Sequence, residues 1–96
     1  MTTLHVENTV RDYDEWKSVF DKFDRFRADN QVRSYRVSRF ADDPSKVHVD
    51  LEFDSRPDAE AFALKLQQIW TTPQSHAQLV AHNEPVLLET LEQRSF

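Results

Sequence analysis

The sequence predicts an α+β sandwich of the ferredoxin-like type, with the element order βαββαβ. Three observations lead to this prediction. Four short stretches alternate apolar and polar residues, which is typical of half-buried strands. Two longer stretches carry apolar residues at three- and four-residue spacing, which indicates amphipathic helices. Only turn residues separate the two middle strands. We therefore expect a four-stranded antiparallel sheet with two main helices on one face, and a short extra helix before the last strand.

The first strand is expected at residues 3–10, where apolar and polar side chains alternate. Asn8 is an exception, because it lies in phase with the apolar residues Leu4, Val6 and Val10. A buried amide at this position either bonds to the backbone at the strand end or the nearby helix start, or is kept for a ligand. The sequence leaves both interpretations open.

The first helix is expected at residues 12–29. Asp12 is a good N-cap, and Glu15 follows three residues later, as in a capping box. With no glycine in the chain, Asn30 is expected to take the left-handed position at the helix end. The apolar stripe of the helix consists of Tyr13, Trp16, Val19, Phe20, Phe23 and Phe26.

Residues 31–41 and 46–54 are predicted to form a hairpin, because residues 42–45 read Asp-Asp-Pro-Ser, a turn composition. The second strand alternates cleanly. The first does so imperfectly, because Phe40 falls out of phase with Tyr35 and Val37. A bulge near Ser38 or Arg39 is therefore expected.

Ser55 is expected to cap the second helix, whose apolar stripe runs from Ala59 to Trp70. The Thr72-Pro73 pair then predicts the start of a short helix that reaches about His82. The final strand is expected at Val86–Glu92.

Composition narrows the class of protein. The 96 residues predict a single domain over residues 1–96. The count of Cys 0 excludes disulfides and thiolate chemistry, and Gly 0 excludes glycine-rich phosphate loops. The net charge of -5 argues against nucleic acid as a partner. No apolar run is long enough to span a membrane, and the first residues do not resemble a signal peptide, so we expect a cytoplasmic protein.

The arginines between residues 25 and 39 are interleaved with aspartates and are expected to form a solvated face, with steering of an anionic ligand as the alternative.

A polar sheet face is the first candidate for chemistry. The strands at 3–10 and 46–54 are expected to be central, parallel neighbours, with Arg36 or Arg39 joining them from the hairpin partner. A hydrated polar face is the expected interpretation, with no metal and no cofactor. The alternatives are a general acid/base pair and a metal site that uses His5, His48 and Asp50. The face carries His5, Glu7, Thr9, His48, Asp50 and Glu52.

Residues 10–17, Val-Arg-Asp-Tyr-Asp-Glu-Trp-Lys, resemble the helix start of small dimeric α+β barrel proteins of the antibiotic-biosynthesis-monooxygenase and polyketide-cyclase-like group. The resemblance continues at residues 20–21, 41–44, 52–54, 61–62 and 84–85. It implies a homodimer whose two sheets face each other, and a small apolar or aromatic molecule as the ligand. It also implies cofactor-independent oxygenation, cyclisation or isomerisation, if the protein is an enzyme.

The second candidate is a pocket between the sheet and the helices. Asn8 is expected to polarise the substrate there, and His76 or His82 to transfer the proton. A non-catalytic ligand-binding or stress-related module with the same pocket is the alternative. The same aromatic residues are also expected in a plain core, because helical spacing requires apolar side chains there in any case. The expected aromatic walls are Trp16, Phe20, Phe23, Tyr35, Phe62 and Trp70.

Overall fold

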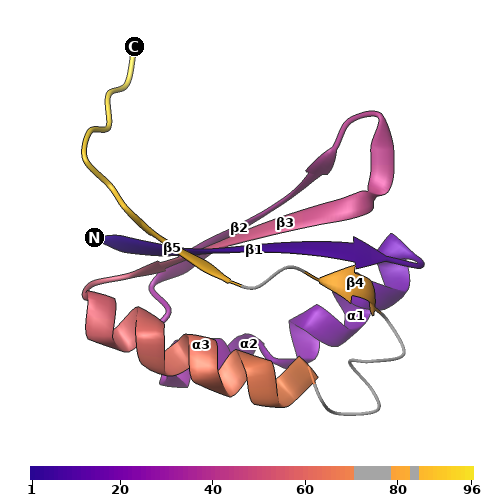
Figure 1. Ribbon diagram of the computed structural model, residues 1–96, viewed down its shortest axis with the longest axis horizontal. Helices are drawn as coiled ribbons and strands as arrows, with labels where there is room; N and C mark the ends of the chain where they lie inside the picture. Colours follow the sequence, from indigo (N-terminus) through magenta and orange to yellow (C-terminus); the bar gives the residue numbers. More distant parts are fainter. Residues whose placement is uncertain (71–78, 83–84) are drawn as a thin grey trace.

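A computed structural model describes residues 1–70, 79–82 and 85–96, with the side chains of residues 69–84 left out of the description. A single sheet lies over a layer of helices (Figure 1). This is the predicted α+β architecture. No helix in the described part of the chain is long and apolar enough to cross a membrane. The elements are β1 (Thr2–Val10), α1 (Tyr13–Lys22), α2 (Asp24–Asp29), β2 (Ser34–Phe40), β3 (Asp43–Phe53), α3 (Arg56–Trp70), β4 (Leu79–His82) and β5 (Val86–Glu89).

The sheet has the order β2-β3-β1, and the other edge of β1 pairs with both β4 and β5. β4 lies beside residues 8–10 of β1, and β5 lies beside residues 2–5. The fourth position of the sheet is therefore filled by two short strands in succession. Each hydrogen-bonded pair of strands in the described part of the chain is antiparallel, as expected for the sheet as a whole.

β1 and β3 are central neighbours, but the prediction that they run parallel is wrong, because they pair in the antiparallel sense. The hairpin reverses the chain between β2 and β3, which makes these two strands antiparallel. The helices α1 and α2 connect β1 to β2, and β3 then lies between these two strands. The parallel relation consequently holds between β1 and β2, which are not adjacent.

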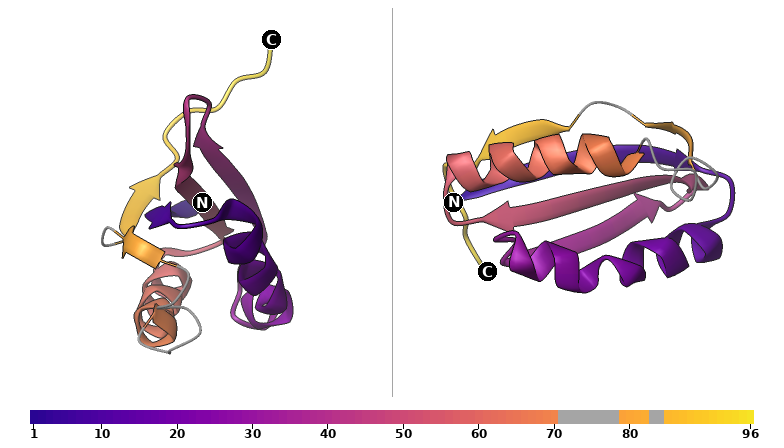
Figure 2. Two further views of the ribbon diagram at one scale, coloured as in Figure 1. Left: turned by 90° about the vertical axis from the view of Figure 1, so that its right-hand side faces the viewer. Right: turned by 90° about the horizontal axis from the view of Figure 1, so that it is seen from below.

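The hydrophobic core lies between the sheet and the helices. Alternate residues of β1 and β3 point towards the helix layer, and Trp16, Ala59 and Phe62 meet them from below. In Figure 2, α3 runs beneath β1, and α1 and α2 run beneath β2, so no helix of the described residues lies over the opposite sheet face. The buried strand residues are Leu4, Val6, Val10, Val47, Val49, Leu51 and Phe53.

The first helical segment begins as predicted and ends differently. The Asp12 side chain accepts a hydrogen bond from the backbone N–H of Glu15. The helix then breaks at Phe23, where φ is -97 and ψ is 13, so that α1 and α2 are separate. Gln31 (φ 75) takes the left-handed position expected of Asn30. The side-chain amide of Asn30 instead donates to the Phe26 carbonyl at 2.7 Å, and the backbone N–H of Asn30 donates to the same oxygen at 3.1 Å.

The prediction that a short helix reaches His82 is wrong, because Leu79–His82 form β4. The rest of that predicted helix lies outside the described residues. Strand formation has a physical reason here: the edge of β1 at residues 8–10 presents backbone donors and acceptors that need partners. The last strand also ends at Glu89, before the predicted Glu92.

The hairpin follows the prediction with a longer second strand. β3 begins at Asp43, within the predicted turn, and the Asp43 carboxylate accepts hydrogen bonds from the backbone and hydroxyl of Ser45. The predicted bulge is confirmed by a register shift between Arg39 and Phe40.

The N-cap of α1 makes a direct test of the helix start. Replacing Asp12 by Ala removes the acceptor for the Glu15 N–H, which lies 3.1 Å from Asp12 Oδ1. We expect Asp12→Ala to lower the free energy of unfolding by about 0.5–2 kcal/mol in urea melts. Asp14→Ala is the matched control, since Asp14 lies in the first turn of α1 and is not its cap residue. An equal loss in both variants would show that only the charge near the helix start matters.

Candidate functional site

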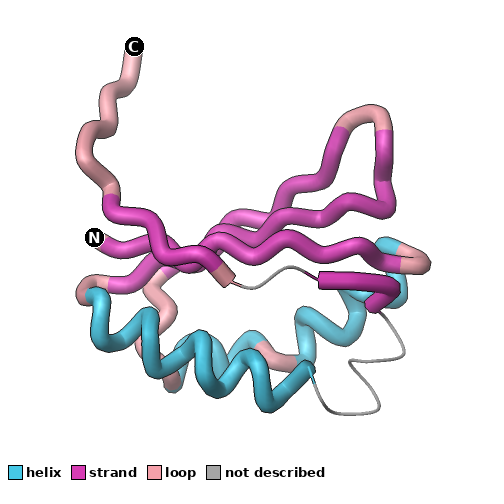
Figure 3. The backbone as a smooth tube through the Cα atoms, viewed as in Figure 1, coloured by secondary structure: helices cyan, strands magenta, loops and turns pink. Residues whose placement is uncertain are grey.

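The sheet face turned away from the helices (Figure 3) is called here the open face. The strand registers place polar residues of adjacent strands on it. Cross-strand pairing places His5 opposite Asp50 and Glu7 opposite His48. Arg36 lies opposite Asp50 from β2 and joins this face. Arg39 does not, because it pairs with the core position of Val47, and its guanidinium lies 4.8 Å from the ring centre of Tyr13. The predicted polar face is thus formed, and Arg36 is the arginine that joins it.

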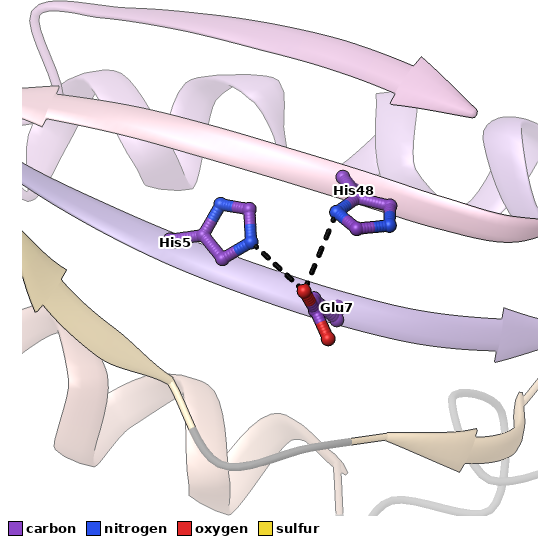
Figure 4. A group of neighbouring side chains, drawn as sticks. All are labelled: His5, Glu7 and His48. Atoms are coloured by element: carbon purple, nitrogen blue, oxygen red, sulfur yellow. Dashed lines mark hydrogen bonds and ion pairs between the residues drawn. The ribbon is translucent and has the colours of Figure 1, made fainter. Parts of the chain in front are cut away.

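Glu7 stands between the two histidines (Figure 4). Its Oε1 atom lies 3.3 Å from Nε2 of His5 and 3.6 Å from Nδ1 of His48. The other ring nitrogen of His5, Nδ1, lies 2.5 Å from Oδ1 of Asp50. The side chains of His5 and His48 retain 25% and 21% of their exposure, so the group is partly covered and still reachable from solvent. We call these four residues the histidine–carboxylate cluster.

The surroundings raise the pKa of His5. Partial burial is the largest single influence on this pKa and lowers it, but hydrogen bonds and charge attraction from Asp50 and Glu7 together outweigh it. The charged imidazolium is therefore favoured between the two carboxylates. A histidine in this position can exchange a proton with a ligand near neutral pH.

Neighbouring contacts hold the cluster in place. The ring of Phe40 stacks on His48 with centroids 4.9 Å apart. The next carboxylate along β3, Glu52, accepts a hydrogen bond from the Thr3 hydroxyl at 2.8 Å and so stands apart from the histidines. A depression of about 570 Å³ adjoins the cluster at Asp50 and extends over Arg36, Glu52 and Leu88. A small polar molecule at this face would meet both signs of charge.

On the covered face of the sheet, Asn8 is buried as its phase predicts, with 6% of its surface exposed. Its Oδ1 atom has no hydrogen-bond partner among the residues that the structure describes. The nearby helix start is capped by Asp12 and not by Asn8. His82 lies beside Asn8 in the backbone pairing of β4 with β1.

The aromatic residues predicted to line a pocket have different environments. Trp16 and Phe62 are buried, and the ring of Trp16 stacks on that of Phe20 at 5.0 Å. Phe23 is half-buried, and its ring meets that of Phe26 edge-on. Tyr35 is 40% exposed and also borders the depression on the open face. Trp70 ends α3, and its side chain, like that of His82, is not among those described. His76 lies outside the described residues.

Arg27 is a buried cation that the sequence does not reveal, since it was expected on a solvated face. Only 5% of its surface is exposed. Its guanidinium lies 3.7 Å from the ring centre of Phe20 and 5.1 Å from that of Tyr35. Burial lowers the pKa of Arg27, against the attraction of Tyr35 and Asp24. Its position four residues after Phe23, on the apolar stripe, was the available signal.

No protein-family model matches the chain, and no curated protein sequence matches it. Solved structures do. A Nitrosomonas europaea protein, provisionally assigned as an antibiotic biosynthesis monooxygenase, superposes with a TM-score of 0.65 at 14% identity over 96% of this chain and 100% of its own. A second antibiotic biosynthesis monooxygenase gives 0.61 at 12% identity, over 96% of this chain and 100% of its own. A Mycobacterium tuberculosis protein gives 0.53 at 14% identity, over 99% and 100%. These matches confirm the predicted resemblance in fold.

The raised pKa of His5 predicts a pH dependence of stability. The charged form is favoured in the folded state, so its contribution is complete below about pH 6.5, the unfolded value, and is lost as pH rises through the higher folded value. In Asp50→Asn the main partner loses its charge, and the pKa of His5, followed by NMR, should fall. The stability advantage of the native protein over this variant should shrink as pH rises above about 6.5.

Glu52→Gln is the matched control for this prediction, because Glu52 lies next along β3 on the same face and bonds to Thr3. It should leave the pKa of His5 near its native value. An Asp50→Asn protein whose His5 titrates as in the native chain would contradict the prediction.

Proposed function

We propose that the protein is a homodimeric α+β barrel protein that binds a small, largely apolar or aromatic molecule between its sheet and its helices. The observation that carries the proposal is Asn8, a buried amide whose Oδ1 has no partner among residues 1–70, 79–82 and 85–96. An unsatisfied buried polar group costs about 1–3 kcal/mol, and such a cost is commonly retained where the group serves a ligand.

The chemistry of an amide fits this role. Rotation by 180° about the last side-chain bond exchanges the oxygen and nitrogen of Asn8, so the same position can accept from a ligand hydroxyl or donate to its anion. Donation to a phenolate or enolate would lower the energy of that anion in a water-poor site. Aromatic side chains near the helices supply apolar contact with a ring system. The described ones are Trp16, Phe20, Phe23, Tyr35 and Phe62, and Trp70 is included in the proposal by its position at the end of α3.

A proton acceptor would complete an active site. His82 and His76 are the candidates, and support for His82 comes from its backbone position opposite Asn8. The reactions that such a site could carry are cyclisation, isomerisation, and oxygenation with dioxygen as oxidant, on a substrate that first loses a proton. Their common requirement is stabilisation of the resulting anion by Asn8. A non-catalytic ligand-binding or stress-related module is the alternative, and it requires Asn8 without the histidines.

Replacing Asn8 by Val separates a ligand-binding amide from a structural one. Valine suits a strand and removes the unsatisfied polar group, so Asn8→Val should keep or raise the melting temperature. Affinity for polycyclic phenols and quinones, titrated by quenching of tryptophan fluorescence, should fall roughly 5- to 150-fold, as expected for the loss of about 1–3 kcal/mol.

Val6→Ala is the matched control for Asn8→Val, because Val6 is buried two residues earlier on the same strand. It should lose stability by about 1–3 kcal/mol through lost packing and retain ligand affinity. A destabilised Asn8→Val protein with native affinity would assign Asn8 to the structure and would remove this site.

The open face supports the homodimer. Several apolar side chains are exposed on or beside it, with Phe40, Val86 and Leu88 at 52%, 51% and 46%. Val86 and Leu88 lie opposite His5 and Thr3 in the β5–β1 register, on the side away from the core. Two copies that pack these faces together would bury this apolar surface.

Light scattering at micromolar concentration should therefore give the mass of two chains. Val86→Lys combined with Leu88→Lys should shift the protein towards one chain, because four lysines would face each other across the interface. Leu64→Lys is the control, since Leu64 is 64% exposed on α3, away from the open face. A native protein that is monomeric under these conditions would overturn the barrel assembly.

A further inference from the structure

The open face brings two imidazoles and a carboxylate together from adjacent strands. The atoms that His5, Glu7 and His48 can offer a metal all lie within 4.8 Å of one another. The carboxylate oxygen of Glu7 lies 3.3 Å from Nε2 of His5 and 3.6 Å from Nδ1 of His48. In a tetrahedral site with bonds of about 2.0–2.1 Å, neighbouring ligand atoms lie about 3.4 Å apart. Two of the three distances between the ligand atoms are thus already close to those of a tetrahedral site.

Asp50 provides a second, independent observation. Its carboxylate holds Nδ1 of His5 at 2.5 Å, so the proton of a neutral ring is on Nδ1 and the lone pair is on Nε2. In the metal-free chain a proton on Nε2 can bridge to the Glu7 carboxylate, and a metal ion that replaces this proton would take up the Nε2 lone pair and the carboxylate together. A carboxylate behind the second nitrogen of a histidine is also the arrangement that orients metal-bound imidazoles.

The backbone makes the arrangement rigid. Glu7 and His48 are directly opposed in the β1–β3 ladder, and His5 and Asp50 form the next such pair on this face. The stacked ring of Phe40 restricts His48 from the side of β2. Sites built on paired strands hold their ligands more precisely than sites on loops.

We propose that His5 Nε2, Glu7 and His48 Nδ1 bind a divalent transition-metal ion such as Zn²⁺, with Asp50 orienting His5 from behind. Two imidazoles and one carboxylate suit zinc and its neighbours, whereas calcium and magnesium prefer oxygen ligands. With three protein ligands and partial exposure, the ion keeps a position open for water or a small anion. Glu7 takes the place that the sequence-based alternative gave to Asp50.

Calorimetric titration of the chelator-treated full chain with zinc chloride tests the site. We expect one ion per chain with micromolar or tighter affinity, and a cobalt(II) complex whose visible spectrum reports a nitrogen- and oxygen-ligated ion. Glu7→Gln and His48→Gln should each weaken binding at least about 100-fold, and Asp50→Asn should weaken it about 10- to 100-fold. Circular dichroism would confirm that each variant is folded, and Asp50→Asn remains informative because it keeps all three ligands.

Two controls keep the result specific. Glu52→Gln removes a carboxylate of the same face that bonds to Thr3, and should bind zinc as the native chain does. The double variant His76→Gln with His82→Gln removes the remaining histidines and should also bind normally. Failure of the native chain to bind zinc below about millimolar concentration, binding that survives Glu7→Gln and His48→Gln, or binding lost with His76 and His82 would each overturn the proposal. Asn8 lies on the opposite face of β1. The outcome of the zinc titration is therefore independent of whether Asn8 binds an organic ligand.

Discussion

The antiparallel register between β1 and β3 is the constraint on which the rest of the molecule depends. With Val6 opposite Val49, every second residue of the two strands enters the core, and the residues between them reach the open face. The same register places Glu7 against His48. A shift by one residue would move the whole polar row into the helix layer and expose the core, so the packing of the core also fixes the geometry of the cluster.

β1 consequently serves two chemical environments. Its covered side carries the buried amide of Asn8, which faces the helix layer. Its open side carries the ionisable groups of His5 and Glu7, which are partly exposed. A buried amide in apolar surroundings suits recognition of an organic anion, because its hydrogen bond is strong where water is scarce. Partly exposed imidazoles and carboxylates suit ions and protons. The two proposals thus concern different ligands on opposite faces of one strand. Substitution of Asn8 tests the first, and substitution of Glu7 or His48 tests the second.

Much of the fold follows from periodicity. The alternating patterns of β1 and β3, the cap at Asp12 and the bulge before Phe40 were all predicted from the sequence, because neighbouring residues decide these features. What the sequence missed depends on contacts between distant segments. β4 forms because the edge of β1 needs partners, and Arg27 is buried because Phe20 and Tyr35 offer ring faces to its charge. The contact between Glu7 and His48 was missed for a simpler reason: with β1 and β3 taken as parallel, this pairing could not be predicted.

The division of the outer strand into β4 and β5 has a consequence for how copies of the chain can associate. Each piece has 4 residues and pairs with a different part of β1, so this edge presents no long uninterrupted row of backbone donors and acceptors. At the other edge, β2 carries Arg36 and Arg39, both exposed. Short or charged edges are poor templates for an added strand. The described edges of the sheet therefore disfavour sideways growth into a continuous ribbon, and the faces of the sheet are better suited to contact with further copies.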